Sequence, residues 1–100
     1  GASPIGTVRA LQREFMRLRT ARALMADGAS AETAIGKLRP PVFFMEKRAF
    51  EARLGRWSLA KIDAALDMLL EAELGAKSTG HPDQEIVERA ALRIASLANR

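Results

Sequence analysis

The chain has 100 residues and contains no cysteine, one histidine and five aromatic side chains. Without cysteine it can form no disulfide, no cysteine-ligated metal site and no thiol nucleophile. The histidine, His81, lies in a Gly-His-Pro turn and has no second histidine or cysteine with which to form a metal site. No apolar run approaches the roughly 18 residues that span a bilayer, and no charged-then-apolar signal segment opens the chain. We therefore expect a cytoplasmic protein with no metal, no cofactor and no membrane contact.

The sequence also lacks any window in which polar and apolar residues alternate over the length of a strand. Apolar residues instead recur three or four positions apart, which predicts amphipathic α-helices. Length and a 48% apolar composition predict one helical domain over residues 1–100. Short connections favour antiparallel neighbours, so the expected fold is all-α, a compact bundle of four to five antiparallel helices.

The first half of the chain predicts three helices. Ser3 is a good N-cap for a helix over 4–26, and Asp27-Gly28 supplies its C-terminal stop. A short helix follows Ser30 and is ended by Pro40. The third helix is expected to run from about Pro41 to Arg56.

Two adjacent phenylalanines, Phe43 and Phe44, follow the proline pair directly. We expect them to face inward in part, together with Phe50 and Trp57, because large aromatic side chains dominate the energetics of a core. The segment 38–48 is therefore the expected packing centre of the domain.

The second half predicts two further helices. Ser58 is the N-cap of a helix with a dense leucine stripe, which Gly75 and the loop over 78–82 should end. Asp83 then begins a last helix.

Charge is distributed unevenly along the chain. Residues 1–57 carry eleven Lys and Arg against five acids, whereas residues 58–100 carry five against seven. Arg9, Arg13 and Arg17 recur every four residues, which places them on one flank of the first helix. They could contact the phosphates of a nucleic acid, or they could cover apolar surface and pair with acids, including those of the fourth helix.

Asp63, Asp67 and Glu71 also recur every four residues, on one flank of the fourth helix. Such carboxylates can perform acid–base chemistry or hold a metal, but the pattern is more typical of a solvated face or of a match for a basic helix. The stretch 75–79 superficially resembles a phosphate-binding loop, but an alanine separates its glycine from its lysine and it ends a helix. Nothing assembles an active site, so no enzymatic activity is expected of this domain.

Four ordered stretches of the chain together form a recognisable pattern: residues 4–14, which begin Pro-Ile and end RALQRE; residues 38–44, LRPPVFF; residues 56–59, RWSL; and residues 69–80, LLEAELGAKSTG. With these stretches the chain resembles the C-terminal domain of bacterial DNA polymerase III delta subunits, which belong to the clamp loader. Glu73 stands where the family often has aspartate, and the charge is retained.

The resemblance implies a helical collar domain that serves DNA replication. In such clamp loaders the C-terminal domains of five subunits pack into a ring, so the implied partners are the ATPase subunits and delta-prime. The family's catalytically inert ATPase-like module and its sliding-clamp contact lie in the N-terminal region, outside these 100 residues. The implied domain is thus part of a non-catalytic subunit, and it neither opens a clamp nor hydrolyses ATP by itself.

A collar domain should expose apolar surface meant for its neighbours. We expect exposure within the set Leu69, Leu70, Leu92 and Leu97, a candidate subunit interface. Primer-template DNA passes the collar in this family, so the flank of Arg9, Arg13 and Arg17 could also face DNA. The alternative function is a stand-alone helical nucleic-acid-binding domain that uses this arginine-rich helix face.

Overall fold

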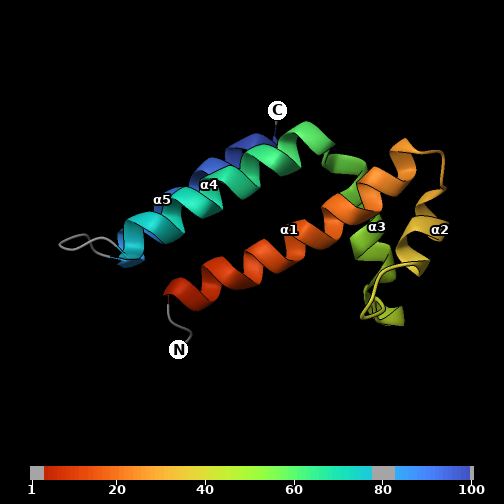
Figure 1. Ribbon diagram of the computed structural model, residues 1–100, viewed down its shortest axis with the longest axis horizontal. Coiled ribbons are helices and arrows are strands. Elements are labelled where there is room, and N and C mark those ends of the chain that lie inside the picture. Colours follow the sequence, from red (N-terminus) through yellow and green to blue (C-terminus); the bar gives the residue numbers. More distant parts are fainter. Residues whose placement is uncertain (1–3, 78–82, 100) are drawn as a thin grey trace.

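Three long helices lie side by side along the long axis of the molecule, and two shorter elements cover one end of them (Figure 1). The computed structural model describes residues 4–77 and 83–99. Within them the prediction of an all-α fold with about five contacting helices is confirmed, and no strand occurs. The elements are α1 (Pro4–Ala26), α2 (Ala31–Gly36), the 3-10 helix η1 (Phe44–Glu46), α3 (Lys47–Arg56), α4 (Leu59–Lys77) and α5 (Asp83–Ala98).

Helix α1 has the predicted bounds and ends through a glycine. The amide of Ala29 donates to the carbonyl of Leu24 at 3.0 Å, and the amide of Gly28 donates to that of Met25 at 3.0 Å. Gly28 has a φ of 108°. This pair of bonds around a left-handed residue is the Schellman motif, which satisfies carbonyls that the helix end would otherwise leave unpaired. The predicted N-cap, Ser3, lies outside the described residues.

The serine caps predicted for α2 and α4 are confirmed by their hydrogen bonds. Ser30 Oγ accepts from the amide of Thr33 at 3.1 Å, and Ser58 Oγ accepts from the amide of Lys61 at 3.2 Å. Helix α4 continues two residues beyond Gly75, to Lys77. The glycine there lies 3.5 Å, measured from an added Cβ, from the side chain of Ile86 on α5. The loop over 78–82, with His81, lies outside the described residues.

The predicted start of the third helix at Pro41 is wrong. Helix α3 begins at Lys47, after the single turn of η1. Phe43 has φ −58° and ψ 141°, an extended backbone that no helix can include. Val42, only 8% exposed, is drawn into the core just before it. The chain therefore crosses from α2 to η1 as an extended segment.

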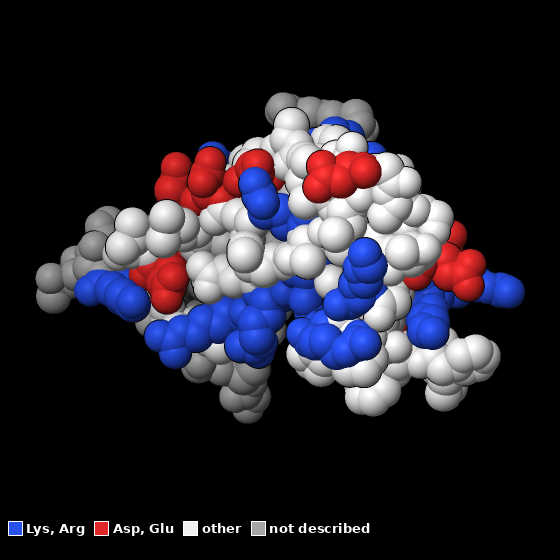
Figure 2. All heavy atoms as spheres, turned by 45° about the vertical axis from the view of Figure 1, so that its right-hand side comes forward, with Lys and Arg blue, Asp and Glu red and all other residues white. Residues whose placement is uncertain are grey.

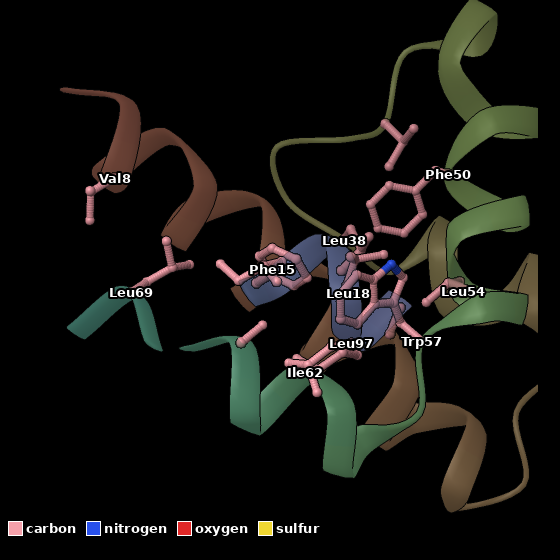
Figure 3. Packing of buried hydrophobic residues seen from close by; sticks show 14 of the residues in the cluster. Val8, Phe15, Leu18, Leu38, Phe50, Leu54, Trp57, Ile62, Leu69 and Leu97 are labelled. Atoms are coloured by element: carbon pink, nitrogen blue, oxygen red, sulfur yellow. The ribbon is translucent and has the colours of Figure 1, made fainter. Parts of the chain in front are cut away.

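The prediction that Phe43 and Phe44 face inward is also wrong. They are 75% and 86% exposed, because the extended segment directs Val42 to the core and the turn that follows to solvent. The buried aromatics are Phe15, Phe50 and Trp57. The rings of Phe15 and Trp57 meet edge to face, with centroids 4.8 Å apart and an interplanar angle of 77°. The core lies between all five α-helices, with α2 contributing Ala34 and Ile35 (Figure 3).

No helix within the described residues is long and apolar enough to cross a membrane.

Candidate interaction surface

A broad groove of about 820 Å³ lies between the outer side of α1 and the segment 39–46. We call it the α1 groove. Figure 2 shows Lys and Arg side chains gathered on both sides of a hollow in the face drawn there. Its lining includes four arginines and two glutamates, and the remaining side chains are mostly apolar. The charged residues are Arg9, Arg13, Arg17, Arg39, Glu14 and Glu46, and the apolar ones are Ala10, Met16, Pro40, Pro41, Val42 and Phe43.

The three arginines predicted from the sequence all line this groove, but they differ in their partners. Arg9 Nε lies 3.8 Å from Glu73 Oε2 on α4. Among the side chains that the structure describes, no carboxylate forms an ion pair with Arg13 or Arg17. Pairing with the acids of the fourth helix therefore accounts for Arg9 alone among the three. Arg13 and Arg17 remain available to a ligand.

Arg39 is the member of the groove that sequence reasoning missed. Its Nη1 donates to the carbonyl of Gly36 at 2.9 Å and to that of Leu38 at 2.7 Å. These bonds fix the guanidinium against the end of α2. Arg39 thereby adds a positive charge to the part of the groove lining that comes from the segment 39–46. No periodic pattern marks Arg39, since it belongs to a connection between helices.

Three consecutive apolar residues beside the groove form what we call the apolar tip. Phe43, Phe44 and Met45 are 75%, 86% and 92% exposed. Large apolar side chains that are exposed next to one another are typical of a site that binds a partner. Their adjacency was a usable signal, since three consecutive side chains cannot all point into one core.

The leucines predicted to form an interface fall into two pairs. Leu70 and Leu92 are 50% and 73% exposed, as expected. Leu69 and Leu97 are only 1% and 8% exposed, so they belong to the core, and the exposure expected within the set is limited to the other two leucines. Each of the two buried leucines belongs to a row of buried residues three or four positions apart. Leu69 lies in the row Ile62, Ala65 and Ala72, and Leu97 continues the row Val87, Ala90 and Ile94. Leu74, 58% exposed, was missed although it lies one turn beyond Leu70.

The acidic flank of α4 mostly serves contacts between helices. Asp63 accepts a 2.7 Å hydrogen bond from Arg19 Nε, and this bond raises the pKa of Arg19. Glu71 lies 3.1 Å from Arg93 Nη1 on α5. The described residues contain no group of three or more acidic or histidine side chains that could hold a metal ion.

Glu73 is the centre of a small polar network between α1 and α4. Gln12 Nε2 donates to its carboxylate at 3.3 Å, and Lys77 Nζ lies 3.5 Å away. The hydrogen bond from Gln12 is the largest influence and lowers the pKa of Glu73. Desolvation, the next largest, raises this pKa, and the charges of Lys77 and Arg9 lower it again. The network aligns α1 with α4 and holds Arg9 at the edge of the groove.

Comparison with protein-family models, curated proteins and solved structures finds no match to this chain.

Proposed function

We propose that this chain is the subunit-assembly, or collar, domain of a DNA polymerase III delta subunit. It would act in the cytoplasm as part of the clamp loader that places the sliding clamp on primed DNA, and it would perform no catalysis itself. The partners would be the ATPase subunits and delta-prime. Contact with the sliding clamp would come only through an N-terminal region outside these 100 residues.

One observation carries this proposal beyond the sequence resemblance. The domain buries a continuous core, yet leaves seven large apolar side chains of the described residues in solvent. Three of these side chains, in the apolar tip, are consecutive, and exposed apolar residues gathered in this way are typical of sites of protein–protein contact. The exposed residues are Met16, Phe43, Phe44, Met45, Leu70, Leu74 and Leu92.

The stretches that carry the resemblance lie in the parts of the fold that set this surface. Residues 38–44 follow α2 and include Phe43 and Phe44 of the apolar tip, and the described part of the last stretch, residues 69–77, includes the exposed Leu70. Residues 56–59 contain Trp57, the core aromatic that joins α3 to α4. The likeness therefore involves both the core and the exposed surface, which supports an assembly role.

The test is co-elution of the chain with purified clamp-loader ATPase subunits and delta-prime, sized by light scattering. We expect a stable complex with the native chain and its loss in the variants Phe44→Asp and Leu92→Asp, because a charge would replace an apolar contact. Glu88→Gln, on the exposed surface of α5, is the matched control and should assemble normally. Absence of co-elution with the native chain would refute the proposal.

The second candidate, a nucleic-acid-binding domain, is favoured by a different observation. Arg13 and Arg17, one turn apart and without ion pairs among the described side chains, line the α1 groove together with the exposed ring of Phe43. Cationic side chains beside an aromatic ring suit single-stranded nucleic acid, whose bases stack on such rings.

Salt dependence distinguishes the two candidates. Each phosphate contact contributes about 0.7 to the slope of log affinity against log salt for a single strand. The variant Arg13→Ala/Arg17→Ala should therefore lower that slope by about 1.4 if both residues contact phosphates. A collar domain should instead bind an isolated strand weakly, with no change of slope between the native chain and the variant.

A further inference from the structure

The α1 groove has the size and the lining of a site for a small molecule. Its volume is about 820 Å³, and ligand sites typically measure roughly 300–1,000 Å³. Such sites combine apolar side chains with a few charged or polar groups that fix the orientation of the ligand. The α1 groove has both kinds of lining, and their chemistry indicates which ligand would fit.

Three arginines give the groove positive charge that the fold leaves without a carboxylate partner. Among the side chains that the structure describes, Arg13, Arg17 and Arg39 form no ion pair. Hydrogen bonds of 2.9 and 2.7 Å to the carbonyls of Gly36 and Leu38 already hold the guanidinium of Arg39, so a ligand need not order it. Arg13 and Arg17 lie one helical turn apart, close enough for a single anionic group to contact both.

The two glutamates of the groove lie at one edge of it. Glu14 and Glu46 also line a neighbouring hollow of about 410 Å³, to which none of the four groove arginines contributes. Arg53 lines that hollow as well, and its Nη1 lies 2.7 Å from Glu14 Oε1. Arg53 therefore balances the charge of Glu14, just as Glu73 balances that of Arg9. Glu46 is then the one glutamate of the lining without an ion pair among the described side chains, against three such arginines, so the net charge of the groove is positive.

The apolar part of the lining suits an aliphatic or aromatic body better than it suits a nucleic acid. Phe43 is 75% exposed and Met16 is 52% exposed, so both side chains can contact a ligand directly. Methionine adapts its shape readily to what it contacts. Phe43 is the one aromatic residue among the described residues of the lining, whereas single strands are held by several rings on which successive bases stack. The other apolar residues offer no aromatic face to a base: Ala10, Pro40, Pro41 and Val42.

We infer that the α1 groove binds a small anionic amphiphile, a molecule with a carboxylate or phosphate head on an aliphatic or aromatic body. The head binds Arg13 and Arg17 through charge-assisted hydrogen bonds, and the body covers Met16 and Phe43. Carboxylate and phosphate share this chemistry, because a guanidinium fork can bind either group with two parallel hydrogen bonds. The inference goes beyond the proposed function, in which no small molecule takes part.

Displacement of a fluorescent probe tests the head and the body of the ligand separately. The probe is anilinonaphthalene sulfonate, which carries one anionic group on an aromatic body. Dodecanoate and dodecyl phosphate, used below the concentrations at which they form micelles, should displace it from the native chain. Dodecyltrimethylammonium has the same tail with a positive head, and it should compete at least about tenfold more weakly. Comparison of the two anions then shows which head the groove prefers.

Two double variants locate the binding site on the chain. Arg13→Ala/Arg17→Ala removes both contacts to the head and should weaken the binding of dodecanoate about tenfold or more. The matched control is Lys47→Ala/Arg48→Ala, which removes two exposed cations that have no ion pair among the described side chains and do not line the groove. The control should bind dodecanoate as the native chain does. Circular dichroism checks that both variants fold.

Three results would overturn the inference. Dodecanoate and dodecyl phosphate could fail to displace the probe, the cationic amphiphile could compete as well as the anionic ones, or the control could lose as much affinity as the arginine variant. If a single-stranded oligonucleotide displaces the probe and neither anionic amphiphile does, the groove binds nucleic acid instead. No clamp-loader subunit is present in these measurements, so failure here leaves the outcome of the co-elution experiment untouched.

Discussion

Replacement of Phe50 by alanine should remove a large share of the free energy of unfolding of this domain. Phe50 is 3% exposed, and its ring points from α3 toward Leu38 and Trp57 (Figure 3). Truncation of a buried phenylalanine costs about 3–5 kcal/mol, because the transfer free energy is lost and a cavity remains. Domains of this size are stable by about 5–15 kcal/mol, so the loss is a large share of the total.

The cost can be expressed as a melting temperature. For a domain of 60–100 residues, 1 kcal/mol corresponds to about 4–8 °C. Phe50→Ala should therefore lower Tm by at least about 12 °C, measured by circular dichroism at the helical band. The free energy of unfolding from urea titration should fall by about 3 kcal/mol or more.

Phe44→Ala is the matched control, because it makes the same chemical change six positions away. Phe44 is 86% exposed, so its truncation should change stability by no more than about 0.5 kcal/mol. Equal destabilisation by the two variants would refute the placement of the extended segment, since it would mean that Phe44 also packs in the core.

Two further predictions concern a backbone position and a titratable group. Gly28→Ala should destabilise the domain by about 1–2 kcal/mol through its left-handed backbone alone, because no atom lies within 4 Å of an added Cβ. Gly36→Ala, with the same open surroundings but a helical backbone, should raise the free energy of unfolding by about 0.5–1 kcal/mol, measured by urea titration. If both glycine variants change the free energy of unfolding in the same direction, this reasoning is contradicted. Because the folded state lowers the pKa of Glu73 below its ordinary value of 4.5, its stabilising contribution is complete above that pH and is lost as pH falls through the lower folded-state pKa. The difference in free energy of unfolding between the native chain and Glu73→Gln should therefore shrink as pH falls. A difference that grows at low pH would show that the pKa of Glu73 is raised in the folded state and not lowered.

Local signals in the sequence are sufficient for most of the secondary structure. The bounds of α1, the caps of α2 and α4 and the start of α5 follow from serine, glycine and aspartate at particular positions. These residues act on the backbone within a few positions of themselves, so their effect does not depend on distant parts of the chain. The three groove arginines that lie on α1 could be found in the same way, because their spacing of four defines one helix flank.

Tertiary structure alone decided which apolar residues the fold buries. Leu69 and Leu70 are adjacent and chemically identical, yet one is 1% and the other 50% exposed, because α1 and α5 cover only part of α4. Phe43 and Phe44 are exposed because the extended backbone places Val42 in the core and leaves the turn that follows in solvent. The α1 groove likewise needs Arg39 to come opposite Arg13 across more than twenty residues of intervening chain. Helix periodicity determines which side chains share a face, but only the packing of one helix on another determines which faces remain open to a partner.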